Sequence, residues 1–241
     1  MADLSYPSLA GTVLPIFLVE GDKAHGFCGA GLLLDKGIFI TCWHCVSAST
    51  SGDKRYVVAI PSTGHECTHI DLKNVERDAS GADLAIGIVD AVPRLQLVLV
   101  PGPFELMGHD VWSFGYPYTD QEPSDSGGYD FTLNGRILRG YVTRTFPYDH
   151  PSGQQVESYE LDMPAPSGMS GAPLVLRGGL QVTGVVFGTH DVETVDAEST
   201  AGRRIQTTRV VSFGLAHTAK TLRAAITSAT NGMPLARFLG Q

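Results

Sequence analysis

Three short segments of the chain hold a hydroxyl, an imidazole and a carboxylate in settings suited to nucleophilic chemistry. Ser170 lies in the glycine-rich segment 168–173, and His44 follows the apolar run 38–41. Asp83 leads directly into a second apolar run. A serine hydroxyl attacks a carbonyl near neutral pH when a histidine accepts its proton and a carboxylate fixes the histidine tautomer. The three segments together therefore predict a catalytic triad of His44, Asp83 and Ser170.

The order of these residues along the chain separates the folds that use such a triad. His44 comes first, Asp83 second and Ser170 last. An α/β-hydrolase would place the serine first, and a subtilisin-like enzyme would begin with the aspartate. Taken alone, a serine between glycines is most often a turn and a histidine after a strand is most often structural. It is their joint occurrence in this order that favours catalysis.

The glycines around Ser170 have a role of their own in this hypothesis. Gly168 permits a backbone conformation that other residues avoid, which lets its N–H and that of Ser170 point at one place. Two such donors form an oxyanion hole, where loss of one donor typically costs about 3 kcal/mol of transition-state stabilisation. Gly171 lets the chain pass closely behind the nucleophile. We therefore predict Gly168 and Ser170 as the oxyanion-hole residues.

Composition and charge exclude several other classes of protein. The chain has 241 residues, 43% hydrophobic and 17% charged, which is ample for a buried core. Its formal charge of −8 and its lack of a basic run disfavour nucleic-acid binding. No segment approaches the ~20 apolar residues of a membrane span, and the first residues do not resemble a signal peptide. We expect no membrane association and a cytoplasmic protein, with secretion as the open alternative.

Short apolar or alternating runs between turn signals predict an all-β protein. With 28 glycines and 14 prolines, turns are frequent. One apolar stripe at intervals of four and three predicts a helix over 215–229, stopped by Asn231 and Gly232. Two long polar segments, 120–130 and 190–206, are expected to be loops. The expected strands span residues 14–19, 31–34, 38–41, 56–60, 84–89, 111–114, 137–142, 174–176 and 182–187.

The motifs resemble those of trypsin/chymotrypsin-like serine proteases, and most of all the bacterial high-temperature-requirement branch. The residues that carry this resemblance are 41–46, 83–86 and 167–173, with lesser matches at 108–117 and 184–188. The resemblance implies two six-stranded antiparallel β-barrels, with a C-terminal α-helix packed outside. It assigns His44 and Asp83 to a first unit, 1–104, and Ser170 to a second, 105–241. It also implies a peptide substrate bound as an added strand.

Departures from the family pattern bear on activation and specificity. Met169 stands where digestive proteases carry the aspartate that pairs with a newly cut N-terminus, so activation by clipping is not expected. Phe187 stands where the family has a serine that supports the triad aspartate. No charge is evident in the predicted substrate pocket, which favours a small or apolar residue before the scissile bond. The predicted pocket residues are Pro164, Ala165, Pro166, Ser167, Phe187, Gly188 and Thr189.

The four cysteines allow more than one interpretation. In the trypsin family, residues at the positions of Cys28 and Cys45 form a disulfide, which a cytoplasmic protein would hold as two thiols. A zinc site is the competing interpretation, because Cys42 and Cys45 have a suitable spacing. Its further ligands would be His65, Cys67 and His69. We expect no metal and no other cofactor.

The leading hypothesis is a serine endopeptidase that acts on protein or peptide substrates through an acyl-enzyme intermediate. A second hypothesis, from another class, is a catalytically silent module that binds peptides in the same cleft. A third is an effector protease that a partner holds inactive until it is triggered. No residue in the sequence identifies such a regulatory partner.

Overall fold

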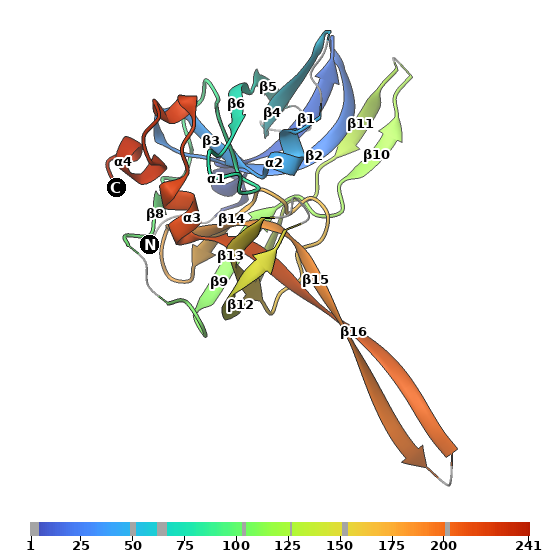
Figure 1. Ribbon diagram of the computed structural model, residues 1–241. Coiled ribbons are helices and arrows are strands. Elements are labelled where there is room, and N and C mark those ends of the chain that lie inside the picture. The colour runs from blue at the N-terminus through green and yellow to red at the C-terminus, as the bar shows by residue number, and fades with distance from the viewer. Residues whose placement is uncertain are drawn as a thin grey trace.

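Two curled, mostly antiparallel sheets form the body of the computed structural model (Figure 1). The structure describes residues 5–48, 52–61, 67–102, 105–125, 127–150, 154–200 and 203–241. This confirms the predicted all-β, chymotrypsin-like fold class. The apolar runs that predicted strands contribute many of its buried residues, such as Ile16, Leu32 and Val185.

The first sheet has the strand order β5-β4-β1-β2-β3-β7-β6. The apolar segment that precedes His44 forms β3, and all four of its residues are buried. We predicted six strands, and the sheet has seven, because two short strands lie on either side of Leu72. The strands are β1 (Val13–Glu20), β2 (Lys23–Leu33), β3 (Ile38–Thr41), β4 (Lys54–Pro61), β5 (Cys67–Asp71), β6 (Lys73–Arg77) and β7 (Ala85–Ile88).

The second sheet has the order β14-β9-β12-β13-β16-β15-β8. An additional pairing between β14 and β15 closes six of these strands into a ring, as the predicted second barrel requires. The seventh strand, β8, pairs with β15 in parallel. The strands are β8 (Val98–Leu99), β9 (Asp110–Gly115), β12 (Arg136–Asp149), β13 (Gln155–Leu161), β14 (Pro173–Leu176), β15 (Gln181–Thr200) and β16 (Arg203–Thr218).

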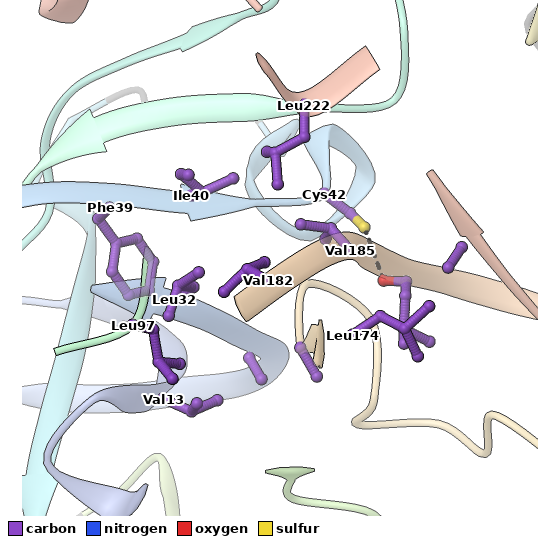
Figure 2. Packing of buried hydrophobic residues seen from close by; sticks show 14 of the residues in the cluster. Val13, Leu32, Phe39, Ile40, Cys42, Leu97, Leu174, Val182, Val185 and Leu222 are labelled. Atoms are coloured by element: carbon purple, nitrogen blue, oxygen red, sulfur yellow. Dashed lines mark hydrogen bonds between the residues drawn. The ribbon is translucent and has the colours of Figure 1, made fainter. Parts of the chain in front are cut away.

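The two sheets share one apolar core. Figure 2 shows Val182 and Val185 of β15 close to Leu32, Ile40 and Leu97, which lie in the N-terminal half of the chain. Strand β8, although it precedes the expected unit boundary after residue 104, pairs with the second sheet. The division into units 1–104 and 105–241 remains a prediction.

The helix predicted over 215–229 is wrong in extent. Residues 215–218 belong to β16, where Leu215 pairs with both Glu160 and Gly188. The helix that follows has only six residues, with Thr218 as its N-cap, and Leu222 packs into the core (Figure 2). The helical elements are α1 (Tyr6–Ala10), η1 (Asp35–Gly37), α2 (Trp43–Val46), α3 (Ala219–Ala224), η2 (Ser228–Thr230) and α4 (Leu235–Leu239).

The two predicted loops are also corrected. Segment 120–130 contributes to a hairpin of β10 (Asp120–Pro123) and β11 (Tyr129–Thr132). In the other segment, residues 190–200 and 203–206 lie in the long ribbon of β15 and β16, which projects from the body of the molecule (Figure 1). Among the described residues, no helix has the length and apolar character needed to cross a membrane.

Candidate active site

The structure brings His44 and Asp83 into direct contact. His44 lies on the one-turn helix α2, immediately after β3, and Asp83 immediately precedes the strand segment that continues into β7. The imidazole Nδ1 lies 2.6 Å from Asp83 Oδ2, and the His44 backbone N–H donates to Oδ1 over 2.9 Å. The Asp83 side chain is 2% exposed and the His44 side chain 46% exposed. The carboxylate is therefore buried while the imidazole faces solvent.

This contact changes the pKa values of both groups. Burial raises the pKa of Asp83, but the hydrogen bond and charge of His44 outweigh burial, so the pKa lies below its ordinary value. The hydrogen bond to Asp83 raises the pKa of His44 well above its ordinary value of 6.5, and Cys45 acts in the same direction. The pair therefore stabilises an imidazolium, as a general base that accepts a proton must.

Ser170 lies on a tight turn between β13 and β14, and its neighbouring glycines have left-handed backbones. Gly168 has φ +95° and Gly171 has φ +86°. A Cβ on Gly168 would lie 2.3 Å from the Tyr116 carbonyl oxygen, and one on Gly171 would lie 1.9 Å from that of Ala30. Both positions thus exclude a side chain by conformation and by space.

Replacing Gly171 with alanine is expected to destabilise the fold by at least about 2 kcal/mol, because a strained φ and a backbone clash act together. Gly178→Ala is the matched control: its φ is +85°, and its Cβ would meet nothing within 4 Å. That control should cost about 1 kcal/mol. Denaturant unfolding of both variants measures the difference, and equal losses would contradict a close approach behind the nucleophile.

The two backbone amides predicted for the oxyanion hole are available to a substrate oxygen. Within the described residues, neither the Gly168 N–H nor the Ser170 N–H donates to an internal acceptor, whereas the Met169 N–H between them donates to Pro166. The Ser170 carbonyl accepts from Ala30 over 2.8 Å, which fixes the orientation of the turn.

The Ser170 hydroxyl does not contact the imidazole in this structure. Its Oγ donates to the Phe187 carbonyl over 3.4 Å. The backbone of Ser170 nevertheless lies beside the histidine helix, because the Cys45 thiol is 3.8 Å from the Ser170 carbonyl oxygen. The structure thus joins two of the three predicted catalytic side chains and places the third nearby, in a different hydrogen bond.

The two segments predicted to line the substrate pocket, residues 164–167 and 187–189, are joined by a hydrogen bond. Thr189 Oγ1 on β15 donates to the Ala165 carbonyl over 2.8 Å, which connects strand and loop. Ala165 is buried, and Pro166 and Gly188 are half-buried. Two further predicted pocket residues, Pro164 and Ser167, are exposed.

The Phe187 ring points into the interior, so that only its backbone is available to line a pocket. The ring packs against His217, with centroids 4.5 Å apart, and against Tyr148 at 5.5 Å. His150 lies on the same ring at 6.2 Å.

The cysteines are all free thiols in the structure, so the disulfide between Cys28 and Cys45 that the resemblance suggested is not formed. Burial raises the pKa of Cys28 to about 11. A hydrogen bond with Cys42 lowers the pKa of Cys45, and His44 contributes in the same direction. Cys42 itself donates to the Val186 carbonyl over 3.2 Å (Figure 2).

The zinc alternative gains no support from the described residues. Cys42 lies within 4.8 Å of Asp83 and His217, and neither Cys67 nor His69 belongs to that group. The remaining proposed ligand, His65, lies outside the described residues.

Two histidines at the site were not predicted from the sequence. His217 is buried, and because a carbonyl oxygen only accepts, its Nε2 donates to the Asp83 backbone carbonyl over 3.2 Å. Burial lowers the pKa of His217 to about 4, so the ring is neutral. His150 follows β12, and its Nε2 lies 3.6 Å from Asp83 Oδ2. Neither histidine has a local sequence signal, since only the fold brings it to Asp83.

The fold is chymotrypsin-like, and the match to a peptidase family makes the chain a serine-type endopeptidase. A model of the trypsin-like peptidase domain matches residues 29–185, and the chain belongs to this family. The family resemblance expected from the motifs is therefore confirmed. Among curated proteins, none matches the chain in sequence.

Solved structures with low sequence identity share the fold. The Rv3671c protease of M. tuberculosis in its active form has a TM-score of 0.57 at 22% identity, covering 88% of this chain and 78% of that chain. Deg5 has a TM-score of 0.57 at 19% identity, covering 90% and 87%. The HtrA-type protease AlgW with a decapeptide has a TM-score of 0.56 at 16% identity, covering 90% and 65%.

Proposed function

We propose that the chain hydrolyses peptide bonds through a triad of His44, Asp83 and Ser170 and an acyl-enzyme intermediate. The observation that carries this proposal is the His44–Asp83 pair, bonded at 2.6 Å, beside a serine turn with two unoccupied amides. Family membership supports the peptidase activity, and the geometry supports the assignment of roles. Substrates are proteins or peptides.

The proposed reaction starts when Ser170 Oγ leaves the Phe187 carbonyl and turns to His44. Oγ bonds to the substrate carbonyl carbon while its proton passes to His44 Nε2, and Asp83 stabilises the resulting imidazolium. The Gly168 and Ser170 amides hold the oxyanion. The C–N bond then breaks, the amine leaves with the proton from His44, and the acyl group stays on Ser170. Water attacks the acyl carbon of this ester and gives one proton to His44. The bond between this carbon and Ser170 Oγ then breaks, His44 returns the proton to Oγ, and the carboxylic acid product leaves.

The proposed pocket accepts a small or apolar residue. The bond between Thr189 and Ala165 holds the two walls together, which leaves little depth for a long side chain between them. Among the described residues at these walls, none carries a charge that would select a charged substrate residue. We propose a cytoplasmic location, as expected from the sequence, where cysteines such as these four remain thiols.

A catalytically silent module of the same fold is the alternative. One observation favours it: the Ser170 hydroxyl rests on the Phe187 carbonyl rather than on the imidazole. Catalytic hydrogen bonds are often unformed in structures without substrate, so the geometry is compatible with activity. The two functions differ in whether Ser170 becomes nucleophilic.

Labelling with a fluorophosphonate separates the two functions, since the reagent reacts with activated serines and needs no knowledge of the substrate. We expect one adduct per chain by intact mass spectrometry and none in the variant Ser170→Ala. A folded wild-type protein that gains no adduct at any pH between 6 and about 10 would favour the silent module.

A further inference from the structure

The carboxylate of Asp83 has a second imidazole beside it. His150 Nε2 lies 3.6 Å from Asp83 Oδ2, the same oxygen that bonds His44 Nδ1 at 2.6 Å. The His150 side chain is 16% exposed, and its backbone N–H donates to the Gln154 carbonyl over 2.9 Å. A polar group held this close to a buried carboxylate affects its orientation and its charge.

The surroundings of the carboxylate explain why this imidazole matters. The Cys42 thiol lies within 4.8 Å of the carboxylate, but it donates to the Val186 carbonyl. His217 on β16 donates to the backbone carbonyl of Asp83 rather than to its carboxylate. Among the described residues, His44 supplies both hydrogen bonds to the carboxylate oxygens. His150 Nε2 is a further polar group beside this carboxylate, and its 3.6 Å separation from Oδ2 is just beyond hydrogen-bond distance.

The position of His150 is set by packing. Its ring lies 6.2 Å from the Phe187 ring and 6.4 Å from that of Tyr148, both at steep interplanar angles. Phe187 also provides the carbonyl that holds the Ser170 hydroxyl. The rings of Tyr148, His150, Phe187 and His217 therefore form one aromatic cluster, which contacts Asp83 through both histidines.

We propose that His150 is a positioning residue for the triad, and that its Nε2–H holds the Asp83 carboxylate in the plane of the His44 imidazole. This inference rests on the proposed function of the triad. His150 takes the supporting place that the resemblance assigns to a serine and that Phe187 cannot fill. A donor at Oδ2 also withdraws negative charge from the bond to His44 Nδ1, so it lowers the basicity of His44.

Asp83, which precedes β7, and His217 on β16 are ionisable groups near His150, and the rings of Tyr148 and Phe187 pack against it. His44 on α2 bonds the same oxygen of Asp83, the Cys45 thiol lies beside His44, and the Cys42 thiol lies beside Asp83. Of these groups, His44 is the one whose proton the reaction moves. A change at His150 therefore reaches the rate through Asp83 and His44.

The test compares His150→Ala and His150→Gln with the wild type, using the rate constant of fluorophosphonate labelling from pH 5 to 10. The alanine variant should label about tenfold more slowly at pH 7. The acid limb of its pH–rate profile should move to higher pH by about one unit. Without the His150 donor, Asp83 raises the His44 pKa further. Glutamine places an amide N–H near the position of Nε2, and should restore most of the rate and the wild-type limb.

The matched control is His25→Ala. His25 lies in the β1–β2 hairpin and its imidazole pairs with Glu20 at 3.4 Å, so this variant should be labelled at the wild-type rate. Thermal unfolding establishes that each variant is folded. If the wild type is labelled and His150→Ala reacts at the same rate, the inference about His150 is wrong while the proposed function stands. Slower labelling in both His150 variants with an unmoved limb assigns His150 a merely structural role, which also overturns it. If the wild type is not labelled at all, both the proposed function and this inference are wrong.

Discussion

Replacing Ser170 with alanine is expected to lower kcat/KM by about 10⁵- to 10⁶-fold, because the triad acts as a unit and its nucleophile is then missing. The fold should remain intact. Among the described residues, the Ser170 hydroxyl makes one hydrogen bond, the long one to the Phe187 carbonyl at 3.4 Å, and the loss of such a bond costs about 1 kcal/mol or less. Hydrolysis of p-nitrophenyl acetate and thermal unfolding measure the two effects separately.

Ser228→Ala is the matched control for this variant. Ser228 is exposed and bonded to Glu76, so its loss should leave hydrolysis unchanged. If Ser170→Ala retains more than about a tenth of the wild-type rate while folded, another group is the nucleophile and the triad assignment is wrong.

Replacing Asp83 with asparagine is expected to reduce kcat/KM by about 10⁴-fold at neutral pH. The carboxylate accepts from both the backbone N–H and Nδ1 of His44. An amide of the same shape can present its NH₂ to Nδ1, which then accepts, and the proton of the neutral ring moves to Nε2. His44 is then unable to take the proton of Ser170.

Asp78→Asn provides a comparison at another buried aspartate, five residues earlier. Asp78 accepts from the Ile226 backbone N–H over 2.8 Å, so its replacement should lower stability while the folded fraction keeps activity within about tenfold. The rate of p-nitrophenyl acetate hydrolysis per folded molecule measures both variants. Similar losses in the two would show that Asp83 acts through the fold rather than through His44.

The sequence was informative where function and local structure coincide. The apolar run before His44 forms β3 with the predicted bounds, and the glycines around Ser170 have the left-handed conformations that their residue type favours. Such features are local, because a four-residue buried strand or a positive φ restricts the amino acids at its own positions.

The wrong predictions of secondary structure, for the helix 215–229 and the loop 190–206, have a different physical origin. Leu215 and Leu222 lie in a spacing typical of one helix face, yet Leu215 is held in β16 by strands on both sides, and only the later residues are helical. The polar composition of segment 190–206 favours a loop, yet residues 190–200 of β15 pair with residues of β16. Tertiary pairing, rather than local preference, decides both cases.

The histidines around Asp83 show most clearly which parts of the site could not be predicted from the sequence. His150 and His217 lie far from Asp83 in sequence, and each is an isolated imidazole without a motif. Their role depends on the distances that the fold sets, 3.6 Å to the carboxylate for His150 and 3.2 Å to the backbone carbonyl for His217. A single sequence carries no signal for such contacts.

Mass-spectrometric peptide mapping of a rapidly quenched reaction detects the proposed acyl-enzyme itself. With p-nitrophenyl acetate in excess, we expect a burst of one p-nitrophenolate per chain and an acetyl group on the peptide that contains Ser170. An acetyl group found only on another residue, or steady hydrolysis with no burst and no adduct, would contradict the proposed acyl-enzyme.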